Sequence, residues 1–273
     1  MQKIKNLAYL VVALIMLQSC SSYHKTLNKG SVEEQYKMAV KMYETQKYSK
    51  ALRLFEKVTP SYRGKPQMER IQFMVSQSNF NIKDYASAGY YFNRFTRNYP
   101  KSSKREEAAF LSALSYYKAS PSFSLDPTDT NKALESFQGF IDKYPNSDKQ
   151  EEANKYYKEL RSKLEKKSFE IAKVYYNTAG YDSRNYRAAI VAFDNLLEDY
   201  LGSVFKEEAL YYRLKASHDL ALRSTDQKIS ERIKNAIQAH EKLKRNFPKT
   251  KYIEDANKML ANLEEKQKQL IKS

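Results

Sequence analysis

The residues able to do chemistry are few and scattered along this sequence of 273 residues. Its three histidines, His24, His218 and His240, have none of the spacings of a metal site, and we expect the last two to pack on or between helices. The six glycines never fall close enough together to form a phosphate-binding loop. Neighbouring acids such as Glu106 and Glu107 point to different sides of a helix and do not flank one substrate bond. We therefore predict no catalytic residue, no metal and no cofactor, and a protein that is not an enzyme.

The single cysteine, Cys20, directly follows the features of an export signal. Lys3 and Lys5 give a positive start, and the apolar run from Leu7 to Leu17 follows. This run is only about half of the roughly 20 residues needed to span a hydrocarbon core, so it is typical of a signal peptide and not of a membrane helix. We therefore predict that the mature protein works outside the cytoplasm.

The segment Leu17-Gln18-Ser19-Cys20 resembles a bacterial lipobox, with Gln18 as a looser fit. In this interpretation residues 1–19 are a lipoprotein signal peptide, and Cys20 carries the covalent lipid on its thiol and its new amino group. Several acyl chains, at about 0.8 kcal/mol per buried methylene, anchor a protein firmly without spanning the membrane. The alternative is an ordinary secretory signal with an incidental cysteine.

The sequence is strongly basic, with 48 Lys and Arg against 32 Asp and Glu, a net charge of +16. Loss of the signal peptide removes Lys3 and Lys5 and leaves +14. Because this charge then lies outside the cytoplasm, we expect no nucleic acid partner. Anionic lipid headgroups and an acidic protein surface both fit the charge, as does a basic surface that only aids solubility.

One pattern recurs along the chain: an aromatic or polar residue, alanine three positions later, and usually phenylalanine four positions after that. It occurs at Tyr48/Ala51/Phe55, Tyr85/Ala88/Phe92, Thr130/Ala133/Phe137 and Tyr186/Ala189/Phe193, and in weaker form at Ile233/Ala236/His240. Alanine lets two helices approach closely, and the larger side chain one turn later fills the groove beside that contact. The pattern therefore predicts five helical hairpins whose stacking buries a continuous core.

The linkers between these hairpins also resemble one another. Pro100, Pro145, Leu201 and Pro248 follow the alanines by twelve residues, and each is followed by Ser or Thr two positions later and by paired acids before the next alanine. Proline cannot continue a helix, the hydroxyl can cap the next one, and acids in the first turn face the positive end of its dipole. Each linker thus marks one helix ending and another beginning.

These observations predict an all-α fold, an α-solenoid of about five tetratricopeptide-like hairpins. Ser31 and Glu34 form a capping box, so we expect ordered structure to begin near Ser31, after a polar tether over residues 20–30. Residues 31–148 would form N-terminal repeats 1–3, and residues 149–273 would form C-terminal repeats 4–5 and a final helix. Residues 151–176, which lack Pro and Gly, are expected to form one long helix joining the two halves.

A peptide-binding groove would be edged by polar and aromatic residues on the first helices of the first three repeats. The candidates are Tyr36, Tyr43, Gln77, Phe80 and Tyr117. Such a groove suits an extended chain with alternating apolar side chains and a terminal aromatic residue. The alternative for each aromatic residue is ordinary core packing.

One basic pair could extend the recognition of such a chain. Lys37 and Lys41 lie one turn apart on the first predicted helix and could attract a free carboxylate at the end of the bound chain. A solvated basic stripe is the alternative for this pair.

Two resemblances extend this interpretation. Residues 71–100 resemble a tetratricopeptide repeat at Ser76, Tyr85, Ala88, Phe92 and Pro100. Nearly the whole chain also resembles the lipoprotein subunit family of the outer-membrane β-barrel assembly machinery, through the lipobox, the five repeats and the following stretches: Tyr144-Pro145-Asn146-Ser147, Ala153, Leu160, Ala172, Tyr175-Tyr176, Tyr186, Ala189, Leu197 and Tyr200. Leu201 and Gly202 depart from that family's pattern.

The second resemblance implies an outer-membrane, lipid-anchored, periplasm-facing scaffold. It further implies that the C-terminal repeats bind a BamA-like barrel subunit and that the N-terminal repeats recognise unfolded outer-membrane proteins. Two alternatives stay open at this point: a tetratricopeptide lipoprotein adaptor for other envelope complexes such as cell-wall enzymes, and a hydrolase built on a helical solenoid.

Overall fold

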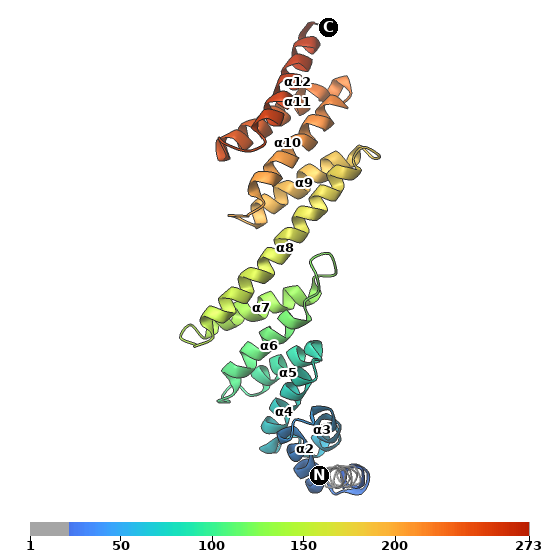
Figure 1. Cartoon of the computed structure of the whole chain (residues 1–273), viewed down its shortest axis with the longest axis vertical. Coiled ribbons are helices and arrows are strands. Elements are labelled where there is room, and N and C mark those ends of the chain that lie inside the picture. Colours follow the sequence, from blue (N-terminus) through green and yellow to red (C-terminus); the bar gives the residue numbers. More distant parts are fainter. Residues whose placement is uncertain (1–21, 273) are drawn as a thin grey trace, which may run out of the picture. The chain divides into compact units, whose positions relative to one another are not determined.

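The computed structural model describes residues 22–272, and every regular element in that range is a helix (Figure 1). The helices named in Figure 1 are α2 (Val32–Glu44), α3 (Tyr48–Tyr62), α4 (Gln67–Asn81), α5 (Tyr85–Asn98), α6 (Arg105–Ala119), α7 (Thr128–Lys143), α8 (Gln150–Thr178), α9 (Arg184–Asp199), α10 (Lys206–Leu222), α11 (Asp226–Asn246) and α12 (Ile253–Lys272). The predicted all-α fold is therefore confirmed. Within the described residues, none of these helices is both long enough and apolar enough to cross a bilayer.

The chain forms two compact units. Among the described residues, unit 1 takes in those up to Pro121 and Asp126–Leu160, while unit 2 takes in Ser122–Leu125 and those from Arg161 onward. In unit 1, each of the helices α2 to α7 packs against the next, and in unit 2 the helices α9 to α12 do the same. This packing of consecutive helices is the arrangement that stacked helical hairpins require.

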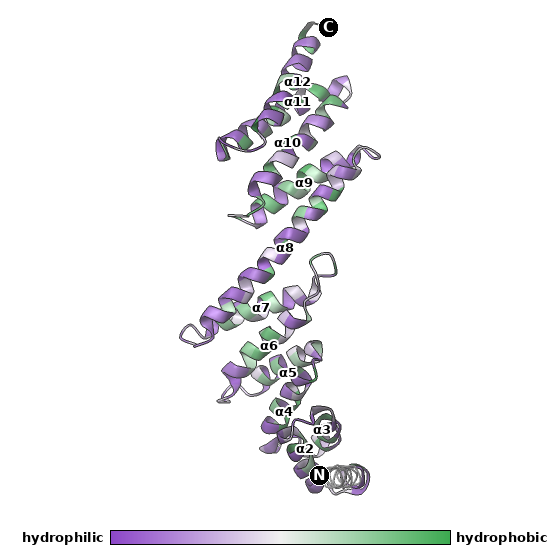
Figure 2. Cartoon of the chain, viewed as in Figure 1, coloured by the Kyte–Doolittle hydropathy of each residue, from purple (hydrophilic) through white to green (hydrophobic). Residues whose placement is uncertain are grey.

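The repeated alanines lie in the core of the hairpins. All five, at positions 51, 88, 133, 189 and 236, are completely buried, as are the four phenylalanines that follow them at 55, 92, 137 and 193. His240, which takes the place of the fifth phenylalanine, is also buried, at 4% exposure. Figure 2 shows hydrophobic segments, in green, alternating with hydrophilic segments, in purple, along the helices.

The linkers cap their helices in a slightly different way from the prediction. The hydroxyl of Ser102 accepts a hydrogen bond from the backbone N–H of Lys104, at 3.1 Å, and Ser203 does the same for Phe205, at 3.0 Å. These bonds lie in the turn before the helix, and the residues at the N-cap itself, Lys104 and Phe205, make no side-chain capping bond. The paired acids do occupy the first turns of α6, α8, α10 and α12, which supports their role at the helix dipoles.

The long helix predicted over residues 151–176 is present as α8, and it contributes to both units. Leu160 and Ala153 belong to a buried cluster with Phe137 of α7, whereas Phe169 belongs to a cluster with Phe193 of α9. The division between the two units falls after Leu160, because the first turns of α8 complete the core of the third hairpin. The assignment of residues 31–148 to repeats 1–3 and of residues 149–273 to repeats 4–5 stays a prediction.

The structure differs from the predicted tether at residues 22–29, which are helical. Tyr23 is 2% exposed and packs with Leu27 against the first hairpin. Its hydroxyl donates to the backbone carbonyl of Lys50, at 3.2 Å. The predicted capping box is present at the following helix, where Ser31 and Glu34 exchange hydrogen bonds. Ordered structure therefore begins before Ser31, because burial of Tyr23 and Leu27, one turn apart, offsets the conformational entropy lost when this short segment is ordered.

Candidate functional site

A hollow of about 450 Å³ lies against the first helices of the first two repeats in unit 1. We call it the N-terminal groove. It is lined by Tyr43 of α2, by Glu69, Arg70, Phe73, Met74 and Gln77 of α4, and by Pro66, Phe95 and Lys104. Two of the five predicted groove residues, Tyr43 and Gln77, are thus brought together here from different helices.

A chain of hydrogen bonds runs along one wall of the N-terminal groove. The Tyr43 hydroxyl donates to Oε1 of Gln77, whose Nε2 donates to Oε1 of Glu107, at 3.5 Å. Glu107 also pairs with Nζ of Lys104, at 2.9 Å. Burial, together with the nearby Tyr48 and Glu107, raises the pKa of Tyr43, so its hydroxyl stays protonated. The wall therefore offers polar groups held in fixed positions.

The floor of the N-terminal groove is aromatic. Phe73 is 9% exposed and lies edge-on to Phe95, with ring centroids 5.3 Å apart. Nζ of Lys104 lies 5.6 Å from the Phe73 ring centroid, and the exposed Arg70 is 3.7 Å from Glu44. An apolar floor with cations at its rim suits an extended apolar segment that ends in, or carries, a carboxylate.

Tyr36 and Phe80, two other predicted groove residues, pack elsewhere. Tyr36 lies against Tyr62, with ring centroids 5.1 Å apart, and it is partly buried on the core of the first hairpin. Phe80 lies edge-on to Tyr85 at 5.5 Å and packs on the core of the second hairpin. Neither lines the N-terminal groove, and for both the packing alternative describes their surroundings.

Tyr117 joins α6 to the first part of α8. The ring centroids of Tyr117 and Tyr156 are 4.4 Å apart, and the Tyr117 hydroxyl donates a hydrogen bond to Oε2 of Glu159 at 2.6 Å. The hydrogen bond to Glu159, reinforced by burial, raises the pKa of Tyr117 to about 12. This tyrosine is therefore a packing residue between helices and lies outside the N-terminal groove.

The basic pair on α2 is partly engaged. Nζ of Lys37 lies 2.7 Å from Oε1 of Glu33, and the hydrogen bond to this carboxylate raises the pKa of Lys37. Lys41 lies in the last turn of the helix and is exposed. Neither Lys37 nor Lys41 lines the groove, whereas Arg70 and Lys104 do, and each of these two is itself paired with a carboxylate, Glu44 and Glu107 respectively. No sequence pattern had singled out Arg70 or Lys104. Arg70, Phe73 and Gln77 share one face of α4 through their three- and four-residue spacing, and this spacing was the available signal.

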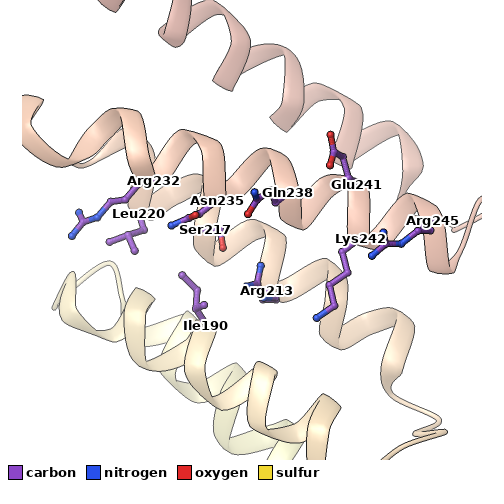
Figure 3. Close-up of a pocket in the computed structure, with 10 residues that line it drawn as sticks. All are labelled: Ile190, Arg213, Ser217, Leu220, Arg232, Asn235, Gln238, Glu241, Lys242 and Arg245. Atoms are coloured by element: carbon purple, nitrogen blue, oxygen red, sulfur yellow. The ribbon is translucent and has the colours of Figure 1, made fainter.

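Unit 2 contains a second hollow, of about 550 Å³, which we call the C-terminal pocket (Figure 3). It is lined by Ile190 of α9, by Arg213, Ser217 and Leu220 of α10, and by Arg232, Asn235, Gln238, Glu241, Lys242 and Arg245 of α11. Figure 3 shows that the polar side chains come mainly from one face of α11 and from the facing side of α10. No pattern in the sequence had indicated this pocket.

The C-terminal pocket is basic. Four cationic side chains line it against one carboxylate, that of Glu241. Arg213 is held by Oδ1 of Asp194, at 2.7 Å, and Arg232 donates to the hydroxyl of Ser224, also at 2.7 Å. Asp194 thus already balances the charge of Arg213, whereas the partner of Arg232 is a neutral hydroxyl. The planar fork of a guanidinium group matches a carboxylate. The pocket therefore suits an acidic segment of another protein.

Both histidines of unit 2 make hydrogen-bond contacts with polar side chains. Nδ1 of His218 lies 2.8 Å from Oδ1 of Asp219, which also accepts, on Oδ2, a hydrogen bond from Tyr176 at 3.0 Å. Nε2 of His240 lies 3.0 Å from Oδ1 of Asn257. Among residues 22–272, no three His, Cys, Asp or Glu side chains come close enough to hold a metal ion. The Tyr176–Asp219 hydrogen bond joins α8 to α10, and the His240–Asn257 contact joins α11 to α12.

Comparison with known proteins identifies the family. A family profile described as "YfiO: Outer membrane lipoprotein" matches residues 28–232, three quarters of the chain. The chain belongs to this family. The match confirms both the resemblance stated from the sequence and the predicted localisation at the outer membrane, facing the periplasm.

Curated relatives agree with the family match. The outer membrane protein assembly factor BamD of Haemophilus influenzae is 25% identical over 185 residues, covering 64% of this chain and 70% of the relative. The outer membrane protein assembly factor BamD of Rickettsia prowazekii is 26% identical over 232 residues, covering 82% and 90% respectively. Cys20 lies outside the described residues, and its lipidation stays a prediction.

Proposed function

We propose that this protein is a non-enzymatic scaffold subunit of the outer-membrane β-barrel assembly machinery, anchored by lipid at Cys20. It binds a BamA-like barrel subunit and unfolded barrel precursors. Family membership together with the names of the relatives supports the role in assembly. The observation that carries the binding role is the presence of a separate hollow of distinct chemistry in each unit, one aromatic and one basic.

The N-terminal groove is the proposed site for barrel precursors. Strands of a barrel alternate apolar and polar side chains, and an extended chain of this kind presents an apolar face to an aromatic floor. Phe73 supplies that floor, while Arg70 and Lys104 stand at the rim for a carboxylate. The fixed amide of Gln77 offers hydrogen bonds to a bound backbone.

A photo-crosslinker tests the N-terminal groove. Placed at Arg70, it should form an adduct with the C-terminal segment of an unfolded barrel precursor. The control places the same group at Ala86, which is exposed on α5 and does not line the groove. Equal labelling from both positions, or labelling from neither, would contradict precursor binding at this site.

The C-terminal pocket is the proposed contact for the barrel subunit. The double variant Arg232→Glu/Lys242→Glu reverses two of its cations and should strongly reduce recovery of a BamA-like subunit with the tagged protein from membranes. Lys234→Glu/Lys244→Glu changes the charge equally on exposed positions of the same helix that do not line the pocket. Purification of the unaltered protein without any barrel-forming subunit would reject the proposed function as a whole.

A further inference from the structure

The N-terminal end of unit 1 carries a group of basic side chains that no contact described above uses. Lys25 and Lys29 are exposed, one turn apart, on the helical residues 22–29. Lys50, Arg53 and Lys57 form a stripe on α3, because their spacing of three and four residues places them on one face. We call these five residues the anchor-side patch.

Contacts hold the two halves of the anchor-side patch together. Nζ of Lys50 lies 5.1 Å from the ring centroid of Tyr23, and Nζ of Lys57 donates to the backbone carbonyl of Leu27 at 2.7 Å. Arg53 lies between Lys50 and Lys57 on the same face of α3. The α3 stripe therefore lies beside residues 22–29.

Basic residues outnumber acidic ones in the region around the anchor-side patch. Residues 22–65 contain ten Lys and Arg and four Asp and Glu. Of these acids, Glu34 is engaged in the capping box with Ser31 and Glu33 pairs with Lys37. An anionic surface facing this end of the unit is thus attracted by several cations at once.

The length of chain between Cys20 and Tyr23 decides which anionic surface lies there. Three residues span at most about 11 Å even when fully extended. Tyr23 is fixed in the core of the first hairpin at 2% exposure, so the anchor-side patch stays close to any lipid carried by Cys20. The attraction of an anionic membrane extends over a Debye length of about 8 Å at physiological salt, which is comparable to that reach.

We infer that the anchor-side patch binds anionic phospholipid headgroups and docks unit 1 on the membrane beside its lipid anchor. The inference rests on the proposed anchor at Cys20. Lipid and patch then act as two linked contacts, so the patch contributes even if its own affinity is weak.

Vesicle binding by the unlipidated chain tests the patch separately from the anchor. The chain from residue 20 onward with Cys20→Ser should bind vesicles containing phosphatidylglycerol, should not bind pure phosphatidylcholine vesicles, and should be released by high salt. Each basic residue near an anionic surface contributes about 1 kcal/mol, so Lys50→Gln/Arg53→Gln/Lys57→Gln should weaken binding by roughly 100-fold.

Two further variants keep the test decisive. Lys25→Gln/Lys29→Gln, at exposed positions, should weaken binding by roughly 30-fold and leaves the contacts of α3 in place. Lys258→Gln/Lys268→Gln removes the same charge from exposed positions of α12 and should leave vesicle binding unchanged. An equal loss in this control would mean that only total charge matters and would overturn the inference.

Two other results would also count against the inference or the anchor on which it rests. Failure to bind phosphatidylglycerol vesicles would overturn the inference, and reduced recovery of a protein partner by the same variants would then assign the patch to a protein surface. The anchor itself is tested in cells, where membrane retention of Cys20→Ser equal to that of the unaltered protein would reject the lipid at Cys20.

Discussion

The contact between α5 and α6 gives a test of how closely the repeats are packed. Gly89 lies on α5, and a Cβ built at this position would lie 2.7, 2.8 and 2.9 Å from three ring atoms of Tyr116 on α6. Tyr116 is only 7% exposed, and the Ser112 hydroxyl donates to the carbonyl of Gly89 at 2.9 Å. The substitution Gly89→Ala therefore forces a buried ring or a helix to move.

Two effects of opposite sign decide the outcome of Gly89→Ala. Alanine favours a helix over glycine by about 1 kcal/mol, whereas inserting an atom into a well-packed core costs about 1–3 kcal/mol. The contacts below 3.0 Å involve a buried ring with little room to turn, which places the cost toward the upper part of that range. We expect a net loss of about 1–2 kcal/mol in the free energy of unfolding.

Gly139 supplies the matched control, because it lies in α7 of the same unit and a Cβ there meets no atom within 4 Å. Gly139→Ala should therefore stabilise unit 1 by about 0.5–1 kcal/mol. Urea unfolding of the two variants, followed by circular dichroism, should give midpoints on opposite sides of that of the unaltered chain. Stabilisation by Gly89→Ala equal to that by Gly139→Ala would refute the close approach of α5 and α6.

Three further predictions test individual contacts. Phe92→Ala empties a completely buried position and should cost about 3–5 kcal/mol in unfolding free energy, while Val191→Ala, at a site 58% exposed, should change it by less than about 0.5 kcal/mol; urea unfolding measures both. In the folded protein the pKa of Tyr117 is raised to about 12, so the free energy of unfolding should fall as the pH rises from about 10 to about 12. Glu159→Gln removes the main cause of the raised pKa and should reduce that fall, measured by unfolding curves taken across this pH range. Tyr23→Ala should release residues 22–29, seen as faster amide hydrogen exchange there, and unchanged exchange would show that Tyr23 does not hold them.

The hairpins could be predicted because the determining residues repeat. A close contact between helices admits few side chains, so alanine must recur wherever two helices meet closely, as at Ala88 and Ala189. A larger apolar group must then fill the space one turn later, as Phe92 and Phe193 do. Constraints of this kind are local and periodic, and they are therefore visible in one sequence.

The helix at residues 22–29 could not be predicted in the same way. Its polar composition indicates a tether, and only Tyr23 and Leu27 show the spacing of a buried face. This helix is ordered by its contact with α3, where the backbone carbonyl of Lys50 accepts a hydrogen bond from Tyr23 and the ammonium group of Lys57 donates one to the carbonyl of Leu27. Such a contact depends on the fold of residues far along the chain, which local pattern does not reveal.

Of the five candidate groove residues, only Tyr43 and Gln77 line the N-terminal groove, and the reason is again that a contact between distant parts of the chain is not visible in local pattern. Tyr43 and Gln77 were chosen by type and by their place on first helices, and the structure places both at one hollow. Tyr36 and Phe80 satisfy the same criteria but face neighbouring rings. Helical spacing gives the face of each residue, whereas the partner opposite that face depends on how successive hairpins are rotated. The local residue pattern does not reveal that rotation.

The independence of the buried clusters leads to a last prediction about function. Phe73 on the floor of the N-terminal groove belongs to a cluster with Phe92 and Phe95 in unit 1, whereas the helices of the C-terminal pocket are held by separate clusters in unit 2. In stacked repeats each hairpin contacts only its neighbours, so the effect of a substitution stays local.

Variants of the groove and of the pocket should therefore separate two losses. Arg70→Glu should lower crosslinking of barrel precursors, measured from a photo-crosslinker at Gln77, without changing recovery of the barrel subunit. Arg232→Glu/Lys242→Glu should do the reverse. If either variant reduced both readouts while both proteins stayed folded by circular dichroism, the two hollows would act as one site, and the assignment of one binding role to each unit would fail.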